Sequence, residues 1–469
     1  MAAITSPGVG SGLDISSLVS QLVAAEGQAT TVRLDGKEAK LQATLSAVGS
    51  LKGVMSEFQA SLGNLKSDSY FDDRTATSED TKLFTASATA SAVLGNYEIE
   101  VAGLAKANKV RSTGFTDSSS VVGTGSMTIT SGSNSFTLTV DSSSDTLAEI
   151  RDAINDSSSN NFVSATIVNV DDGSGGTESR LVLTTKNVGA ANALTITVDD
   201  DDLNDTDASG LSHLATANLV QLDPAQDAVV KIDGQAVTRS SNTISDAIDG
   251  VTLELLTETE TPGTTTGLTI GTDTASVFSS VASFVTSYNK MIEVFNQLSS
   301  YDPTTGVSGT LFGDATLRSI ENQVRREITN TVDSLNGSIT NLVDIGITTT
   351  DSGALKLDST ILKGAISDNM DDLAKLFSSE DGIATRLDSL VDSYVKSTGV
   401  LGSRTSSLND QVQDITEQRI ALENRLASLE SRLLAQFTAL DTLVSQLNST
   451  STYLSQQLAN LPGAYSPSN

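Results

Sequence analysis

The sequence has few of the residue types on which protein chemistry most often depends. Its 469 residues include no cysteine, no tryptophan and a single histidine, His213, and aromatic residues make up only 4% of the chain. These absences exclude disulfides, thiol nucleophiles and most zinc sites. They also exclude any catalytic triad or metal site that needs a second histidine.

Long apolar runs are also absent. No run approaches the roughly 18 apolar residues of a membrane-spanning helix. The first 30 residues lack the basic region and the apolar core of a secretory signal peptide, because their longest apolar run is Leu22–Ala25 and the first basic residue is Arg33. We therefore expect no membrane insertion, and we expect any export to use a route that reads an uncleaved amino terminus.

Basic residues are also few. The sequence contains 28 lysines and arginines and 58 acidic residues, which gives a net charge of −30. Such a chain repels phosphate backbones and anionic lipids, so neither nucleic acid nor membrane is an expected partner. Residues 112–230 hold 17 acidic and three basic residues, a net charge of −14. Solubility explains this segment, and an outward-facing domain is the alternative.

Both ends of the chain carry helical heptads, whose apolar residues predict pairing with another helix. The first helix begins near residue 13, with Asp14 or Ser11 as its cap. Its seam is made of Leu34, Leu41, Val48, Leu51, Met55, Phe58, Leu62 and Leu65. The carboxy-terminal seam contains Leu408, Val412, Ile415, Leu422, Leu426, Leu429, Leu433, Leu440, Leu447, Leu454 and Leu461, is interrupted by Arg419 and Gln436, and ends at Pro462. Two such stripes can cover each other or the stripes of neighbouring copies.

Between the helical ends, from about residue 80, the alternation of apolar and polar residues predicts short antiparallel strands. Expected strands are 97–101, 136–140, 163–170, 180–185, 194–198, 228–232, 251–256 and 268–270. Thr146 and Glu149 predict a capping box. A repeated Asp-Ala-Ile pattern at Asp152 and Asp246 suggests two related modules that each contain a short helical turn, although chance can produce so short a match.

Helical periodicity resumes at about Ala275 and predicts two further helices, through Val277–Leu298 and through Leu317–Ile328. A pair of short strands is expected at Val343–Thr348 and Ala354–Leu357. The helices of this region are expected to pack against the amino-terminal stripe. The fold class is therefore α+β and multidomain, with a terminal coiled coil, a helical bundle and inserted antiparallel β domains.

Candidate chemical sites are weak. Gly8, Gly10 and Gly12 lack the strand and the full spacing of a phosphate-binding loop, so a flexible start to the first helix is favoured. The acidic run 199–207 fails the spacing of a calcium loop and suits a solvated loop. We expect no enzyme activity, no cofactor and no metal.

Five stretches, in order along the chain, resemble the flagellar filament cap protein family, also called hook-associated protein 2. They are GVGSGLDISSLVSQLVAAE at 8–26, NTISDAIDGVTLELL at 242–256, GTLFGDATLRSIENQVR at 309–325, DIGITTTDSGALKLD at 344–358 and LLAQFTALDTLVSQLNSTSTYLSQQL at 433–458. In addition, residues 145–156 are similar to a short motif of flagellins. The remainder of 112–230 shows only general β patterning, and the family varies most there.

The resemblance implies four domains. The terminal coiled-coil leg would comprise 1–40 and 432–469, and the helical domain 41–79 and 276–431. An inner β domain would comprise 80–111 and 218–275, and a variable, acidic outer β domain 112–217. The two β domains would form a head.

The resemblance also implies a function and its partners. The protein would cap the distal tip of the bacterial flagellar filament, promote flagellin polymerisation and prevent the loss of exported flagellin. Its partners would be flagellin, the hook-filament junction proteins, the flagellar type III export apparatus, an export chaperone and other copies in a ring of about four to six, a number that heptads do not fix. The protein would be extracellular, exported without signal cleavage.

We assign the flagellin and self-assembly contacts to apolar residues at the two ends of the leg. These are Ile15, Leu18, Val19, Leu22, Leu440, Leu447, Leu454 and Leu458. A secreted adhesin with a β head on a coiled-coil stalk is the alternative. Exposed aromatic residues in the head would favour it, and 112–230 offers only Phe115, Phe136 and Phe162.

Overall fold

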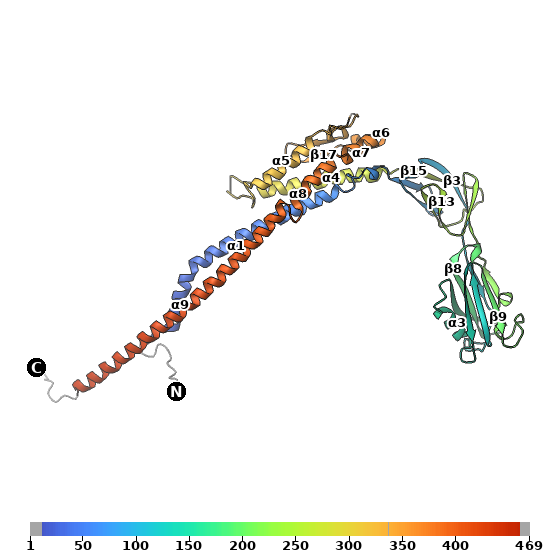
Figure 1. The fold of residues 1–469 in the computed structure, drawn as a ribbon, viewed down its shortest axis with the longest axis horizontal. Helices are drawn as coiled ribbons and strands as arrows, with labels where there is room; N and C mark the ends of the chain where they lie inside the picture. Colours follow the sequence, from blue (N-terminus) through green and yellow to red (C-terminus); the bar gives the residue numbers. More distant parts are fainter. Residues whose placement is uncertain (1–11, 336, 460–469) are drawn as a thin grey trace. The chain divides into compact units, whose positions relative to one another are not determined.

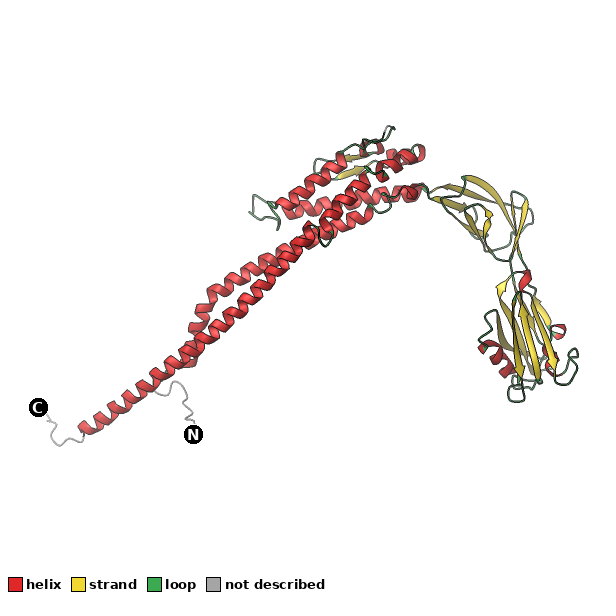
Figure 2. Cartoon of the chain, viewed as in Figure 1, coloured by secondary structure: helices red, strands yellow, loops and turns green. Residues whose placement is uncertain are grey.

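The computed structural model describes residues 12–335 and 337–459 (Figure 1). The chain folds as two compact units, one from the described parts of 1–68 and 276–469 and one from 69–275. Helices dominate the first unit and strands the second, as the colours of Figure 2 show. The predicted α+β multidomain class, helical at both ends with inserted antiparallel sheets, is confirmed.

The helical unit contains two very long helices, α1 and α9, and several shorter ones. They are α1 (Ile15–Ser61), α4 (Thr274–Ser299), α5 (Ala315–Thr329), α6 (Ser359–Asp368), α7 (Met370–Ser378), α8 (Ile383–Val395) and α9 (Val400–Ala459), with the short helix α2 (Asp68–Phe71) at the boundary, the 3-10 helix η4 (Leu342–Ile345) and the hairpin β16 (Ile347–Thr349) and β17 (Leu355–Leu357). In the part of the chain that the structure describes, no helix combines the length and the apolar character needed to cross a membrane.

Helices α1 and α9 pair in antiparallel fashion, as expected from the two heptad stripes. Glu26 of α1 binds Arg425 of α9 at 2.7 Å, while Asp35, further along α1, binds Arg419, which lies earlier on α9, at 2.6 Å. The predicted seam residues of α1 are buried or half-buried throughout. The α9 seam is buried at Leu408 and Ile415 and half-buried as far as Leu433.

The remaining helices pack on the second half of α1 around an aromatic core. Phe58 of α1 lies 5.8 Å from Phe284 and 5.9 Å from Tyr288 of α4, measured between ring centroids, and Phe284 in turn lies 6.0 Å from Phe377 of α7. All four side chains are fully buried. The expected packing of the later helices against the amino-terminal stripe is therefore confirmed.

The β unit consists of two parts, each with its own hydrophobic core. The inner part contains β1 (Arg74–Ser78), β2 (Phe84–Ala88), β3 (Gly95–Gly103), β11 (Ala228–Ile232), β12 (Gln235–Arg239), β13 (Thr243–Ile248), β14 (Val251–Leu255) and β15 (Thr266–Thr272). They form a five-stranded sheet of order β1-β15-β3-β11-β12 and a three-stranded sheet of order β13-β14-β2. Every pairing is antiparallel.

The outer part is a second pair of antiparallel sheets with one helix. It contains β4 (Ala107–Arg111), β5 (Gly125–Ser131), β6 (Asn134–Val140), α3 (Leu147–Asp156), β7 (Val163–Asp171), β8 (Thr177–Val188), β9 (Leu194–Asp200), β10 (Val220–Asp223) and the 3-10 helices η1 (Ala190–Asn192), η2 (Gly210–Leu214) and η3 (Thr216–Asn218). The sheet orders are β10-β4-β8-β7 and β6-β5-β9.

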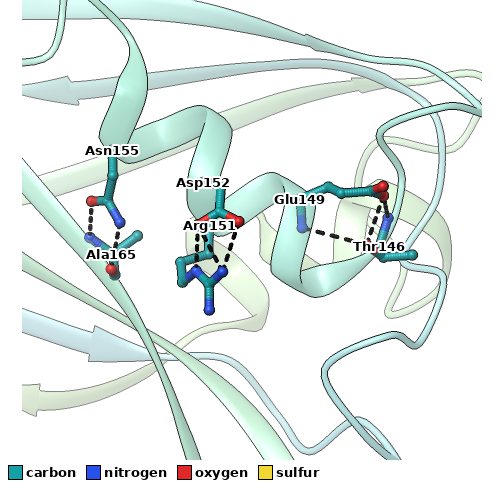
Figure 3. A network of polar contacts seen from close by, with 6 residues as sticks. All are labelled: Thr146, Glu149, Arg151, Asp152, Asn155 and Ala165. Carbon is teal, nitrogen blue, oxygen red and sulfur yellow. Dashed lines mark hydrogen bonds and ion pairs between the residues drawn. The ribbon is translucent and has the colours of Figure 1, made fainter.

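Helix α3 begins with the capping box that the sequence predicts (Figure 3). The Glu149 N–H donates to Thr146 Oγ1 at 3.3 Å, and the Thr146 N–H donates to the Glu149 carboxylate at 3.1 Å. At the other end of α3, the Asn155 amide exchanges two hydrogen bonds, of 2.8 and 2.9 Å, with the backbone of Ala165 in β7. These bonds fix the helix against its sheet.

All eight expected strands of the β unit are present. The prediction that Asp246, in the second copy of the repeated pattern, lies in a helical turn is wrong. Asp246 lies in strand β13 and not in a helical turn. The strand reverses at Asp249 and Gly250, and Ile248 pairs with Val251. Gly250 has a φ of 72°, which suits an Asp-Gly hairpin turn, so turn chemistry overrides the resemblance to α3.

The expected strand at Val343–Thr348 begins later than predicted. Residues Leu342–Ile345 form η4, because the Asn341 side chain accepts hydrogen bonds from the N–H groups of Val343 and Asp344 at 2.9 and 3.3 Å. Strand β16 follows and pairs with β17.

Asp314 supplies a prediction about stability, because it both caps α5 and binds α9. Its carboxylate accepts from the N–H groups of Thr316 and Leu317, each at 3.0 Å, and from Arg404 at 3.0 and 2.6 Å. The Arg404 hydrogen bonds are the main reason that the pKa of Asp314 lies below its ordinary value of 3.8. Replacing Asp314 with alanine should lower the free energy of unfolding by about 1–3 kcal/mol.

The pH dependence of this difference follows from the lowered pKa. The carboxylate stabilises the fold fully above the unfolded pKa, and this stabilisation disappears as the pH falls through the folded pKa. Urea unfolding followed by circular dichroism should therefore separate the parent and Asp314→Ala at pH 7. The difference should begin to shrink only below about pH 4, the ordinary pKa, and disappear below the lowered pKa of the folded state. Asp358→Ala is the control, since Asp358 caps α6 with no ion pair among the described residues, and it should lose only about 1 kcal/mol. Equal losses in the two variants would contradict the role of Arg404.

Candidate interaction site at the overhanging end of the paired helices

The start of α1 is fixed by its predicted cap. The Asp14 carboxylate accepts from the Ser17 N–H at 3.0 Å and from the Ser16 hydroxyl at 2.7 Å, and these bonds hold the pKa of Asp14 below its ordinary value. The alternative cap, Ser11, lies outside the described residues. Asp14 is therefore a negatively charged cap at the positive end of the helix dipole.

The four predicted contact residues of α1 divide into two pairs. Ile15 and Val19 are buried, with exposed fractions of 3% and 0%, whereas Leu18 and Leu22 are 40% and 46% exposed. The first pair packs inside the chain itself. Only the second pair presents an apolar surface to other molecules.

Helix α9 continues beyond the point where α1 begins (Figure 1). Ile15 lies eleven residues before Glu26, which binds Arg425, so in an antiparallel pair it faces α9 about eleven residues after Arg425, near Gln436. The last 20 residues of α9 therefore have no described residue of α1 opposite them. We call residues 440–459 the overhang.

The overhang carries the other four predicted contact residues, and all four are exposed. The exposed fractions are 54% for Leu440, 60% for Leu447, 54% for Leu454 and 64% for Leu458. They recur at heptad spacing, and residues 442–459 contain no charged side chain. Within the described residues this leucine stripe has no partner helix, and an exposed apolar surface of this kind mediates protein association. Leu461 and Pro462, which the sequence places at the end of this stripe, lie outside the described residues.

Close to the start of α1 the two helices leave a groove. A cavity of about 740 Å³ is lined by residues 20–32 of α1 and by Leu426 and Glu430 of α9. Gly27 allows the approach of Leu426, since a Cβ at this glycine would lie 2.7 Å from Leu426 Cδ1. The pairing is therefore close at Gly27, which itself lines the groove.

Arg419, which interrupts the α9 heptads, binds α1 through charge instead of apolar contact. Its guanidinium donates to Asp35 at 2.6 Å and to Glu38 at 2.5 Å. A polar group at a seam position favours one register of a helix pair over others. Arg419 therefore fixes which residues of α9 lie beyond α1.

The candidate chemical sites that lie in the described residues are held by ordinary structural contacts. No group of three or more histidine, aspartate or glutamate side chains in the described part of the chain is placed to hold a metal ion. The buried carboxylate of Asp200 accepts from the Ser212 N–H at 2.7 Å and thus fixes the acidic loop. His213 hydrogen-bonds Thr113, and its ring contacts Phe115 at a tilt of 52°, with the centroids 4.9 Å apart. Gly8 and Gly10 lie outside the described residues, and Gly12 precedes the cap of α1 with a φ of 74°.

The aromatic residues of the outer part do not form a binding surface. Phe115, Phe136 and Phe162 are all buried, with exposed fractions of 9%, 6% and 1%. Phe136 and Phe162 contact each other in the core, with ring centroids 5.7 Å apart. These three residues therefore do not provide the exposed aromatic surface that would have favoured an adhesin head.

Comparison with known proteins assigns the chain to a family. Residues 11–108 match the flagellar hook-associated protein 2 N-terminus, residues 225–449 match the flagellar hook-associated protein 2 C-terminus, and residues 126–187 match the flagellin hook IN motif. The chain is 33% identical over 471 residues to the A-type flagellar hook-associated protein 2 of Pseudomonas aeruginosa, with 97% of each chain covered. The chain belongs to the flagellar hook-associated protein 2 family.

Other members of the hook-associated protein 2 family also match nearly the whole chain. The flagellar hook-associated protein 2 of Escherichia coli K12 is 35% identical over 477 residues, which cover 98% of this chain and 99% of that protein. The crystal structure of the D1-D2-D3 domains of the flagellar cap protein FliD from Escherichia coli matches 77% of this chain, with a TM-score of 0.63 and 32% identity. The resemblance found in the five sequence motifs is thus confirmed.

The contact at Gly27 predicts how the helix pair responds to a larger side chain. Gly27→Val should force Leu426 aside and destabilise the pairing of α1 with α9 by about 1–3 kcal/mol. Gly36→Val is the matched control, because a Cβ at Gly36 meets nothing within 4 Å and valine is the better helix former. Thermal unfolding followed by circular dichroism should show a lower midpoint for the first variant only. A similar fall in both variants would contradict close packing at Gly27.

Proposed function

We propose that this chain is a subunit of the cap at the distal tip of the bacterial flagellar filament. It promotes the polymerisation of flagellin beneath the cap and prevents the loss of exported flagellin. Membership of the hook-associated protein 2 family supports this function, as does the description of the matching Escherichia coli structure as a flagellar cap protein. The single structural observation that carries the proposal is the uncharged leucine stripe of the overhang.

The mechanism that we propose needs a weak and replaceable contact and no bond-making chemistry. Leu440, Leu447, Leu454 and Leu458, together with Leu18 and Leu22, contact flagellin and neighbouring cap subunits. Ile15 and Val19 hold α1 on its partner helix. Burying an exposed leucine contributes about 1.5–3 kcal/mol, so a few such contacts hold a subunit and still release it as each flagellin is added. The chain acts as a structural protein and not as an enzyme.

The proposed partners follow from this role. They are flagellin, the hook-filament junction proteins, the flagellar type III export apparatus with an export chaperone, and other copies in a ring of about four to six. The proposed location is the extracellular filament tip, reached by export without signal cleavage. Within the chain, we propose a leg of 1–40 and 432–469, a helical domain, an inner β domain and an outer β domain. Their edges differ from the expected ones, because β1 (Arg74–Ser78) lies in the inner sheet and β4 (Ala107–Arg111) and β10 (Val220–Asp223) lie in an outer sheet.

The leucine stripe gives the test of this proposal. Leu447→Ser combined with Leu454→Ser should leave the helical unit folded, because both side chains are exposed and outside the paired seam. In cells that make only this variant, filaments should be several-fold shorter and flagellin monomers should accumulate in the medium. Filament length by electron microscopy and secreted flagellin by immunoblotting are the measurements.

A matched control and a second variant complete the test. Val400→Ser alters an exposed apolar residue at the opposite end of the same helix, with an exposed fraction of 48%, and should leave growth unchanged. Deletion of residues 1–35 should stop filament growth. Filaments of normal length in both the double leucine variant and the deletion would show that the leg is not the contact.

A further inference from the structure

The helical unit contains a second apolar groove, far along the sequence from the leg. Two adjoining cavities, of about 350 and about 270 Å³, lie between α5 and the β16–β17 hairpin and share Ile328, Thr329 and Thr349. The buried side chains of Ile328, Ile347 and Leu355 line the groove. Apolar hollows of this size bind side chains or small ligands.

The groove is rigid, because the hairpin is tied to α4. The hydroxyl of Tyr288, which also lines the groove, donates to the Gly353 carbonyl at 3.2 Å. Burial raises the pKa of Tyr288 to about 12, so the hydroxyl keeps its proton at physiological pH. The Asn289 amide exchanges two hydrogen bonds with the backbone of Leu355, at 2.8 and 2.6 Å. A partner therefore meets a preformed site and orders little on binding.

Two arginines of α5 line one end of the groove. Arg325 is paired with Glu321, at 3.1 and 2.7 Å. The neighbouring Arg326 is exposed, and its side chain has no hydrogen bond or ion pair within residues 12–335 and 337–459. In a chain with a net charge of −30, an unpaired guanidinium beside an apolar groove favours an anionic partner that also carries an apolar side chain.

The acidic loop 199–207 has this combination. Leu203 at its tip is 94% exposed, the largest fraction among the exposed large hydrophobic residues of the described chain. It stands between Asp202 and Asn204, with exposed carboxylates at Asp201 and Asp205. The Leu203 N–H donates to the Asp200 carbonyl at 3.0 Å, and the Asn204 N–H donates to the Asp202 carboxylate at 2.9 Å. The leucine is therefore held outward by a fixed loop.

We propose that the acidic loop of one copy docks in the α5–hairpin groove of a second copy. The Leu203 side chain covers Ile328, Ile347 and Leu355, and the Asp201 carboxylate approaches Arg326. This inference rests on the proposed function, in which copies assemble into a ring. Because loop and groove are different surfaces, the contact is heterologous, and contacts of this kind form rings when the rotation between neighbouring copies closes.

Charge and size both favour a second copy as the partner. At its α5 end the groove offers Arg326 beside apolar side chains, while Asp344 lines the hairpin end, and the loop offers a carboxylate beside Leu203. Every copy carries both surfaces. A single leucine with a short loop buries far less than the roughly 800 Å² per partner of a stable complex. The contact therefore does not hold two copies together alone, but it sets the neighbour and the orientation in an assembly that other surfaces also hold.

Disulfide cross-linking tests the geometry without interference, because the chain has no cysteine. Full-length Leu203→Cys and Thr329→Cys chains with different tags are mixed under assembly conditions and oxidised. We expect a dimer that contains one chain of each kind and disappears on reduction. Leu222→Cys, at a 42% exposed residue of the same β unit, replaces Leu203→Cys in the control and should give at most a trace of mixed dimer.

Charge reversal tests the pairing that we infer. Arg326→Glu and Asp201→Lys should each weaken assembly about tenfold or more, measured by analytical ultracentrifugation, and their combination in one chain should restore it. A merely structural role of either residue would not give this rescue. The Asp201 side chain has no hydrogen bond or ion pair in the described residues, so its replacement leaves the loop's own bonds intact.

Several results would overturn the docking. The absence of a mixed dimer would do so, as would normal assembly of Arg326→Glu. Capture of flagellin by Leu203→Cys in place of a second copy would also overturn it. If Arg326→Glu assembles and caps normally while the double leucine variant of the overhang fails, the docking is wrong and the proposed function stands. If both the overhang variant and the deletion of residues 1–35 cap normally, the proposed contact through the leg is wrong, whatever the outcome for the docking.

Discussion

The antiparallel pairing of α1 with α9 is the constraint on which the helical unit depends. The two helices come from opposite ends of the sequence, and the aromatic core around Phe58 and Phe284 forms only when α1 lies beside the later helices. The register of the pair, fixed by Gly27 against Leu426 and by Arg419 between Asp35 and Glu38, also determines where the pairing ends. The leucines past this end are exposed for that reason alone, since their spacing is the same as that of the leucines inside the seam.

The helices can be predicted from the sequence because their apolar residues repeat at heptad spacing over many turns. Which part of α9 is left uncovered cannot be predicted in this way. Heptads at Leu34–Leu65 and Leu408–Leu433 identified the seam, but no local pattern distinguishes a covered leucine such as Leu426 from an exposed one such as Leu447. That difference depends on where the partner helix starts. For the same reason Ile15 and Leu18 were grouped together in the sequence, although the first is buried and the second is exposed.

In the β unit, most strands that were predicted alternate apolar residues with polar ones, but the prediction missed β5, which also alternates, and the strands with few large apolar residues. Strand β1, for example, has the sequence RTATS and contains no large apolar residue. It is a strand because it pairs with β15, which has a clear apolar alternation. The groove between α5 and the hairpin was also not predictable. It depends on Tyr288 and Asn289, which lie more than 60 residues from their partners Gly353 and Leu355. Charge, by contrast, is readable directly, and residues 69–275 carry 30 acidic against 10 basic residues.

The strands that open and close the β unit are direct neighbours. Arg74 of β1 pairs with Thr272 of β15, so the chain leaves and rejoins the helical unit through two strands about 4.8 Å apart. The outer part is inserted in the same way. Lys106 and Gln226 pair as an isolated antiparallel β-bridge, and the outer part is the segment of chain between these two residues. Each part is thus an insertion with adjacent ends. In evolution, such an insertion can be exchanged, enlarged or deleted without moving the residues on either side of it.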